Sequence, residues 1–587
     1  MPLRPNHEIE QFWRAVARYS FRDGSFVWGS PATGNAISDA EQLLAILFPA
    51  TSLHRFRLDV PDETVDEVLE PLRLVGDRFT VPRRLLRAQT DYLTRYRDAE
   101  QRPIFPAGTY LTPAGPPDDI VESYAIGLRL SLASIGFARV YRTSVADSDA
   151  RAEAGRLEDL ASTRLTAAMV GLLRSFAVQT FDNDSASDRR LRRLIAQEHR
   201  DESAVLAEFR SRLAEIRVSL YEEVTIGSRA PDEARAARDA RFACGWSWGV
   251  ITDTPEIEVE MAGVAQPAGT AARVPELYFT WTAVQAISEL FSQRTRLLAL
   301  LGEDQQRLAR ALQLRSDLTL AYWSRLATFG DHQWPVERLP WRGISGEESD
   351  YDSLLVTAMT MTEVGARTGN TDIAFGYLLR VFARLATRHR IVRPPHADPP
   401  GTVSLTGHRI PLAKTTLGPA TTYHAADFTT VLFNAVVHAA AATPNDQLRT
   451  DLTDLGELIW SHLPSETPRN DRSGLVRFGM PSATGPDWHN VLRLSDGMTV
   501  AAATAGGAGP AVRPLGFVHQ LLDDADAAVD TLNAAGEAEW ATQRGEIEVR
   551  LKRARRLADQ HPARAAALLY QVIGALDPLL PDDEPPP

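Results

Sequence analysis

Apolar residues recur at helical spacing along most of this chain, and this periodicity constrains its fold more than any other feature. Within residues 118–140, five large apolar residues share one helix face: Ile120, Tyr124, Leu128, Leu132 and Ile135. The opposite side is also largely apolar, which is typical of a helix buried within its domain. Further helices are predicted over 279–301, 304–329, 351–368, 372–388, 425–442 and 445–462. The sequence therefore predicts a mainly all-α protein.

Changes in composition divide the chain into four parts. Residues 1–145 and 241–505 carry apolar helices and aromatic residues, and we expect them to form one helical core. Residues 146–240 are charged and poor in aromatic residues, with two long helical patterns over 152–181 and 187–220. We expect an inserted antiparallel helical hairpin there. Residues 506–587 are expected to form a linker, a C-terminal helical arm and an acidic, proline-rich tail.

Charge and cysteine content exclude several classes of protein. The formal net charge is −13, with 63 basic against 76 acidic residues, so a chain-wide nucleic-acid surface is not expected. Cys244 is the single cysteine, which excludes a disulfide framework and thiolate-rich metal sites. No uncharged apolar stretch reaches the roughly 20 residues that a spanning helix needs. We expect a cytoplasmic protein with no membrane span and no metal site.

Four segments rich in glycine and aromatic residues each precede an apolar helix. The segments are 23–29, 245–249, 341–343 and 474–479, and the helices that follow begin near Ser38, Thr280, Tyr351 and Trp488. Glycine permits a turn with positive φ, and the adjacent aromatic ring can pack over the end of the helix. The spacing between the copies is irregular. They are therefore either equivalent corners of one ring of helices or four unrelated turns.

The first two of these segments, 23–29 and 245–249, carry a family resemblance. Asp23-Gly24-Ser25 followed by Trp28-Gly29 resembles the Asp-Gly-Ser-Trp-Gly element of the terpenoid-cyclase and protein-prenyltransferase superfamily, with two residues inserted. Proteins of that superfamily are α/α toroids whose inner helices line an apolar cavity. The resemblance implies an α/α toroid-like core around a central hollow, a shape more than an activity. It also implies four cavity-lining residues: Trp28, Trp246, Trp248 and Trp281.

One run of acidic residues has the spacing of a metal-binding motif. Asp118, Asp119 and Glu122 match the Asp-Asp-x-x-Asp/Glu motif with which class I terpene synthases bind Mg²⁺ and diphosphate. The partner motif of those enzymes is missing, because Leu191 stands where its acidic residue should be. Two prolines before Asp118 mark a helix start, where acidic residues stabilise the positive end of the helix dipole. We favour this capping role over catalysis.

The remaining polar candidates have simple structural interpretations. Four histidines lie among the predicted helices of the second half, and we interpret them as hydrogen-bonded structural residues: His424, His438, His462 and His489. Arg380, Arg384 and Arg388 recur every four residues on one helix face and could meet an anionic partner, although a solvated face is the simpler interpretation. Neither a nucleophile elbow nor a phosphate-binding loop is present.

The absence of a complete catalytic set favours a non-catalytic scaffold that binds protein partners through the hairpin and the arm. All basic residues except Lys414 and Lys552 are arginine, which indicates a GC-rich bacterial genome, and we expect the protein to belong to a bacterial multi-component system. The alternative is an isoprenoid-binding or terpene-cyclase-like enzyme. Mg²⁺ is expected only under that alternative, and otherwise no cofactor is expected. The oligomeric state is not predicted.

Overall fold

The structure is a computed structural model. It describes residues 3–28, 35–107, 111–112, 119–197, 200–220, 240–330, 333–344, 346–366, 372–389, 391, 408–412, 422–425, 427–443, 445–463, 487–505, 522, 525–533, 538–557, 569, 572 and 575–576.

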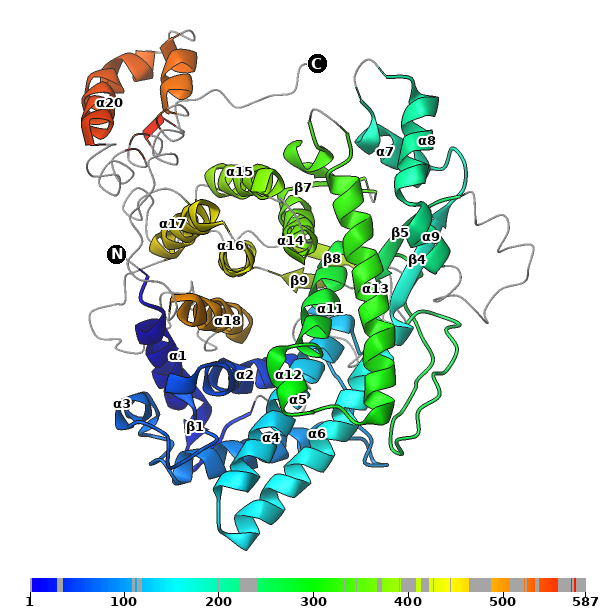
Figure 1. Cartoon of the computed structure of the whole chain (residues 1–587), viewed down its shortest axis with the longest axis vertical. Coiled ribbons are helices and arrows are strands. Elements are labelled where there is room, and N and C mark those ends of the chain that lie inside the picture. Colours follow the sequence, from blue (N-terminus) through cyan, green and yellow to red (C-terminus); the bar gives the residue numbers. More distant parts are fainter. Residues whose placement is uncertain are drawn as a thin grey trace.

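Helices dominate the described residues, which confirms the predicted all-α class (Figure 1). The α-helices are α1 (Pro5–Ser20), α2 (Ala36–Ser52), α3 (Asp66–Leu69), α4 (Thr80–Arg95), α5 (Val121–Ser144), α6 (Ser148–Arg174), α7 (Ala186–Ile195), α8 (Glu202–Arg212), α9 (Ala214–Ser219), α11 (Leu277–Glu289), α12 (Gln293–Leu297), α13 (Glu303–Ala327), α14 (Asp350–Ala366), α15 (Asp372–Arg388), α16 (Phe428–Ala442), α17 (Asp446–His462), α18 (Trp488–Ala505) and α20 (Ala538–Leu557). Short 3-10 helices are η2 (His54–Phe56), η3 (Glu70–Leu72) and η6 (Pro335–Glu337).

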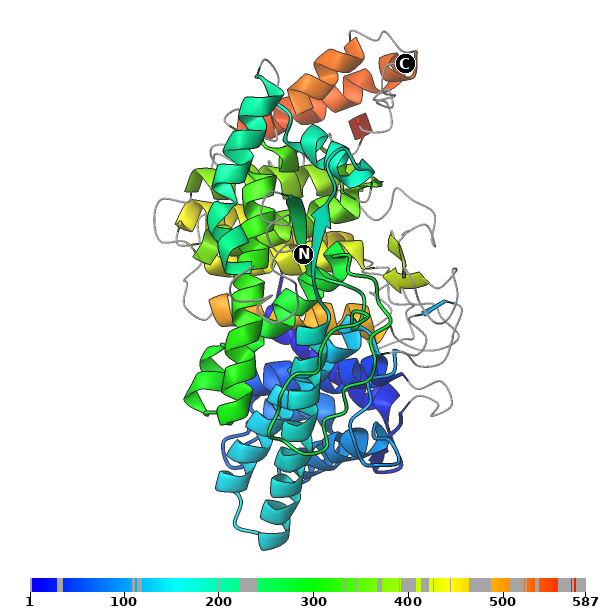
Figure 2. The same cartoon turned by 90° about the vertical axis from the view of Figure 1, so that its right-hand side faces the viewer.

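The strands are short and antiparallel. β1 (Phe21–Arg22) pairs with β2 (Ser25–Phe26), β4 (Phe176–Phe181) with β5 (Arg241–Trp246), and β6 (Trp341–Arg342) with β7 (Glu348–Ser349). In the longest pair, Phe176 lies opposite Trp246. A three-stranded sheet has the order β3 (Leu111–Thr112), β9 (Thr422–Ala425), β8 (His408–Pro411). Figure 2 shows β8 and β9 at one side of the helical body.

Six helices form a closed circuit of contacts. α2 packs against α5, α5 against α11, α11 against α14, α14 against α16, α16 against α18, and α18 against α2. We call these six the ring helices, and Figure 1 labels them around the middle of the molecule. Other helices pack on them: α1 on α18 and α2, α6 on α5, α13 on α14, α15 on α14, and α17 on α16. The finer expectation, a toroid with a hollow centre, stays a prediction.

The glycine- and aromatic-containing segments precede ring helices. Residues 23–28 form the β1–β2 turn before α2, with Asp23 and Gly24 at positive φ. Residues 245–249 follow β5 and precede α11, and residues 341–343 lie at β6, before α14. Gly245, at a φ of +155°, has no room for a side chain, because a Cβ there would lie 2.4 Å from Thr280 Oγ1 on α11. The fourth segment, 474–479, lies outside the described residues.

The start of α2 differs from the sequence prediction in a way that matters for function. In the sequence, Ser38 followed three residues later by Glu41 is a capping-box pattern, which predicts a helix over 38–48 with Ser38 as its N-cap. The helix instead begins after Asn35, whose side chain accepts a hydrogen bond from the Ser38 backbone N–H at 3.1 Å. Glu41 therefore lies inside the helix and is 1% exposed. Because α2 is a ring helix, its polar side chains need partners within the protein.

Residues 146–240 differ from the expected long hairpin. α6 packs closely against α5, since Gly171 leaves room for the ring of Tyr124, which a Cβ would approach to 2.6 Å. The pattern over 187–220 forms three helices, α7, α8 and α9, in place of one. Ser185 and Asp201 cap α7 and α8 and so begin new helices. The apolar face was nevertheless predicted, because Phe209, Leu213, Ile216 and Leu220 are buried in the main core.

The C-terminal residues have a hydrophobic core of their own. Large apolar side chains between Leu522 and Leu576 pack together, including Trp540, Ile547 and Leu551, and they form a cluster separate from the main core. The predicted helical arm corresponds in part to α20, which Figure 1 shows beside the main body. Within the described parts of the chain, no helix is both long enough and apolar enough to cross a membrane.

Candidate metal centre

Five buried charged side chains meet where the ring helices begin. Glu41 comes from α2, Glu122 from α5, Asp427 from the residue before α16, and His489 and Arg493 from α18. Their side chains are between 0% and 11% exposed. We call these five residues the histidine–carboxylate centre. Helix amino ends carry partial positive charge, so carboxylates are stabilised where several of them converge.

His489 joins two carboxylates from different helices. Its Nδ1 lies 2.9 Å from Glu41 Oε1, and its Nε2 lies 2.9 Å from Asp427 Oδ2. Burial and the nearby Arg493 lower the pKa of His489, but its hydrogen bonds to Asp427 and Glu41 outweigh both and raise that pKa to about 10. The imidazole therefore carries a proton on each nitrogen and bridges α2 to the start of α16.

Asp427 is the partner of several side chains in and around the centre. Besides His489, it accepts from the Tyr351 hydroxyl at 2.6 Å and pairs with Arg493 Nε at 2.9 Å. Burial raises the pKa of Asp427, but Arg493 and His489 outweigh this effect and hold the pKa well below its usual range. Asp427 is therefore an ionised carboxylate that fixes the positions of His489 and Arg493.

Three tyrosines surround the centre. Tyr278 and Tyr351 are each the second residue of their ring helix, and Tyr423 lies on β9. The Tyr278 and Tyr423 hydroxyl oxygens are 2.9 Å apart, and Arg493 donates to Tyr278 at 3.4 Å. Burial raises the pKa values of Tyr278 and Tyr351 well above the usual value for tyrosine, so these hydroxyls are neutral donors. Tyr423 thereby ties β9 to the amino ends of the ring helices.

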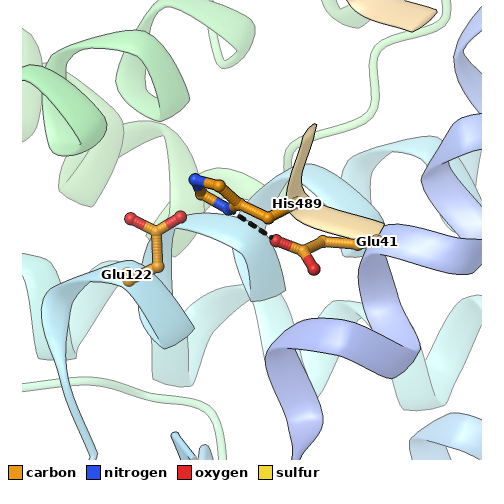
Figure 3. A group of neighbouring side chains, drawn as sticks. All are labelled: Glu41, Glu122 and His489. Atoms are coloured by element: carbon orange, nitrogen blue, oxygen red, sulfur yellow. Dashed lines mark hydrogen bonds and ion pairs between the residues drawn. The ribbon is translucent and has the colours of Figure 1, made fainter. Parts of the chain in front are cut away.

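Glu122 is the exception in this network. Its side chain is 4% exposed, and its Oε2 atom is buried without a hydrogen-bond partner. Figure 3 shows the Glu122 carboxylate pointing toward His489, which is bonded to Glu41. One ligand atom from each of Glu41, Glu122 and His489 lies within 4.8 Å of the other two. An acceptor buried without a donor costs about 1–3 kcal/mol, and more when it is charged.

Two more acidic residues lie at the amino ends of ring helices. Glu276 precedes α11, and Asp352 lies in the first turn of α14. Burial, with repulsion from Asp352 and Glu347, raises the pKa of Glu276 to about 8. Burial and repulsion from Glu347 raise the pKa of Asp352 to about 7. The amino-end side of the ring is therefore acidic beyond the centre itself.

The structure separates the acidic residues of the predicted metal motif. Asp118 lies outside the described residues. Asp119 is not among the three grouped ligands and instead accepts hydrogen bonds from the Phe105 backbone N–H at 3.1 Å and the Tyr124 hydroxyl at 3.2 Å. Glu122 is the one motif residue found in the histidine–carboxylate centre. Glu122 lies in the first turn of α5, where the capping role that we favoured would place it. Because Glu41 and His489 lie beside it, it could also ligate a metal.

The four predicted cavity tryptophans lie in different surroundings. Trp28 is half-buried and stacks on Phe26, and Trp246 is fully buried and donates to the Leu172 carbonyl at 2.8 Å. Trp248 is 2% exposed, and its carbonyl accepts from the N–H of Val121, the first residue of α5. Trp281 lines a pocket of about 350 Å³ formed by α5, α11, α14, α16 and α18. Of these four, Trp281 alone is among the residues of that pocket.

The predicted arginine strip is mostly engaged with its own surroundings. Arg380 lies 4.3 Å from the ring centre of Tyr377, Arg384 donates to the Glu337 carbonyl at 2.8 Å, and Arg388 pairs with Asp350 at 3.0 Å. These contacts favour the simpler interpretation, a solvated face. The anionic-partner role of the strip stays a prediction.

A family model described as SCO2524-like matches residues 1–583. The chain belongs to the SCO2524-like family. No curated protein and no solved structure matches it.

The residues of the centre fit a divalent cation. Histidine nitrogen and carboxylate oxygen are ligands that Zn²⁺, Mn²⁺ and Fe²⁺ accept in proteins. Each ring nitrogen of His489 is bonded to a carboxylate, Nε2 to Asp427 and Nδ1 to Glu41, so a metal would bind Nδ1 in place of the proton shared with Glu41. We predicted no metal site from the sequence, whereas the structure brings together three side chains that can ligate one.

Proposed function

We propose that the protein is a divalent-metal-dependent enzyme whose metal ligands are Glu41, Glu122 and His489. The observation that carries this proposal is the buried Glu122 oxygen, which has no hydrogen-bond donor although a histidine and a second glutamate lie beside it. Buried charges in proteins are paired or coordinate metals. A cation held by these three side chains would satisfy Glu122.

The charges of the centre support a divalent ion. The three carboxylates of Glu41, Glu122 and Asp427 outnumber the two cationic groups, Arg493 and protonated His489, by one. A divalent metal on Nδ1 takes the place of one histidine proton, so binding it adds one positive charge. The buried centre then becomes neutral, which removes the desolvation cost of an unbalanced charge.

The surroundings of His489 also have the form of a metal site. Metal-ligating histidines almost always donate their other ring N–H to a carboxylate, a carbonyl or water, which fixes the ring orientation. Asp427 occupies this position at 2.9 Å from Nε2 and is itself held by Arg493 and Tyr351. This arrangement would make Asp427 a positioning residue of the site.

The number of protein ligands favours catalysis over a purely structural role. Structural zinc sites are usually closed by four protein ligands, whereas catalytic sites have three and leave one position for water or substrate. A metal with an open position supplies a Lewis acid and an activated water. In this chain the hydroxyls of Tyr278 and Tyr423 bond to each other next to Arg493, and such polar groups could orient a polar substrate.

Metal binding by wild-type protein and an E122Q variant tests the proposal. We expect wild-type protein, stripped with a chelator, to bind one Zn²⁺ or Mn²⁺ per chain by isothermal titration calorimetry. Glu122→Gln keeps the shape but removes the charge, and should weaken binding about a hundredfold or more. Glu289→Gln on the same ring, at the carboxyl end of α11, is the matched control and should bind as wild type. Equal affinity of E122Q and wild type would refute the site.

Water relaxation separates an enzyme from a structural metal protein. If the bound Mn²⁺ keeps an exchangeable water, the loaded protein should enhance the relaxation of solvent protons more than free Mn²⁺ does. Stoichiometric binding without this enhancement would mean a closed site and would overturn the catalytic part of the proposal.

Partner binding remains a second proposal, supported by the separate core of the C-terminal residues. Because this core shares no cluster with the main one, removing residues 506–587 should leave the thermal unfolding of the remaining chain unchanged. The same truncation should abolish recovery of the protein's partners in a quantitative pull-down, and unchanged recovery would contradict a docking role for the arm. The isoprenoid alternative stays a prediction, to be checked by incubation with prenyl diphosphates and Mg²⁺.

A further inference from the structure

A pocket of about 400 Å³ lies between α7 and the β6–β7 hairpin. Four arginines line it: Arg190 and Arg193 from α7, and Arg338 and Arg342 from the segment that runs into β6. Glu348 is the single acidic side chain among the described residues that line the pocket. We call this pocket the arginine pocket. None of its residues belongs to the histidine–carboxylate centre.

The positive charge of the arginine pocket is not balanced by its lining. Glu348 lies 2.8 Å from Arg342 Nε, and both side chains are exposed, so this ion pair is weak. Arg193 and Arg338 have no carboxylate among the lining residues described. Such a concentration of positive charge on a chain with a formal net charge of −13 makes a local field that attracts anions.

Backbone carbonyls position two of these guanidinium groups. Arg190 Nη1 donates to the Ile344 carbonyl at 3.2 Å, and Arg338 Nη1 to the Ala196 carbonyl at 3.4 Å. Arg190 also packs on Gly346, whose φ is +98° and where a Cβ would lie 2.3 Å from the guanidinium carbon. A carbonyl bond orients an arginine without cancelling its charge, so the pocket wall is both ordered and cationic.

We propose that the arginine pocket binds a phosphate-bearing small molecule. Guanidinium groups match phosphate oxygens with paired, charge-assisted hydrogen bonds. The volume lies within the range of about 300–1,000 Å³ that is usual for small-ligand pockets. Leu194, Leu339 and Pro340 add an apolar wall for the part of the ligand that is not phosphate. These features favour a compact phosphate ester or diphosphate over an extended acidic partner.

The test is titration of the full-length protein with inorganic pyrophosphate in metal-free buffer, so that phosphate cannot bind through a metal. We expect saturable binding that sulfate does not reproduce. A double variant, Arg193→Gln with Arg342→Gln, should lower the affinity about tenfold or more, because two charge-assisted contacts to phosphate are lost. Both side chains are exposed, so the variant should melt at the wild-type temperature.

The control carries the same loss of charge at other exposed positions, Arg210→Gln with Arg310→Gln. It should bind pyrophosphate as wild type does. Repeating the titration with a nucleoside triphosphate tests the apolar wall, and tighter binding than pyrophosphate supports an organic phosphate as the ligand. The proposal is overturned if neither pyrophosphate nor the nucleotide binds, or if the variant with Arg193→Gln and Arg342→Gln binds them as wild type does. It is also overturned if this variant and the control lose the same affinity.

Discussion

Replacing Asp427 by alanine is expected to cost about 3–5 kcal/mol of the free energy of unfolding. The Asp427 carboxylate is fully buried and accepts from His489, Arg493 and Tyr351. Its removal leaves two buried cationic groups without their shared counter-ion, which is far more costly than losing an exposed ion pair. Denaturant titration followed by far-ultraviolet circular dichroism measures the change.

Asp62→Ala, at an exposed position in a turn, is the matched control and should change the free energy of unfolding by less than about 0.5 kcal/mol. Asp427→Asn keeps the side-chain shape and one carbonyl acceptor, so it should be destabilising but less so than alanine. If Asp427→Ala proves as stable as Asp62→Ala, the centre does not hold the ring helices together as described.

Asp188→Ala, in a different part of the molecule, is expected to lower the free energy of unfolding by a similar amount, about 3–5 kcal/mol. Asp188 is 0% exposed and pairs with Arg241 of β5, which is itself nearly buried and donates through Nη2 at 2.8 Å. Asp188 also accepts from the Asp184 backbone N–H at 3.0 Å. Its removal should leave Arg241 without its counter-ion and loosen the contact of α7 with the β4–β5 ribbon.

The exposed Asp182, in the loop between β4 and α7, provides the comparison as Asp182→Ala. We expect its unfolding midpoint in denaturant to match wild type, whereas that of Asp188→Ala should fall. Equal midpoints for the two variants would show that the Asp188–Arg241 pair contributes little to stability.

Helix periodicity was enough to predict the class of the fold, because most of these helices bury a wide apolar face. The approximate positions of α5, α13, α14, α15, α16 and α17 follow from it, whereas the helix predicted over 279–301 is broken into α11, which ends at Glu289, and the short α12. Helix boundaries were harder to predict. Asn35 and Ser38 are both good N-cap residues, and only tertiary packing decides between them. Polar capping residues at 185 and 201 likewise interrupt an apolar stripe that continues across three helices.

Of the residues in the candidate centre, the sequence indicated only Glu122 as a possible metal ligand. Its acidic neighbours in the chain suggested a metal motif, but the residues that complete the centre come from elsewhere. His489 lies 448 positions from Glu41 and 62 from Asp427, and a single sequence contains no sign that such residues meet. The one available signal was chemical: Glu122 and His489 both stand at the start of an apolar helix, where a buried polar side chain needs a partner.

The arginine pocket was missed for a related reason. We singled out Arg380, Arg384 and Arg388 because they share a face of one helix, yet two of them bond to neighbouring segments. Arg190 and Arg193 line a pocket only together with Arg338 and Arg342, which lie on the segment that runs into β6. Periodicity along one helix detects a stripe, whereas a pocket forms between elements.

Anomalous X-ray scattering from crystals of the protein loaded with Zn²⁺ would test the metal centre most directly. The account predicts one strong peak at the zinc absorption edge, about 2.0–2.2 Å from His489 Nδ1 and from a carboxylate oxygen of both Glu41 and Glu122. Zinc bound only at other residues, with His489 still bonded to Glu41 and no peak between these three side chains, would contradict it.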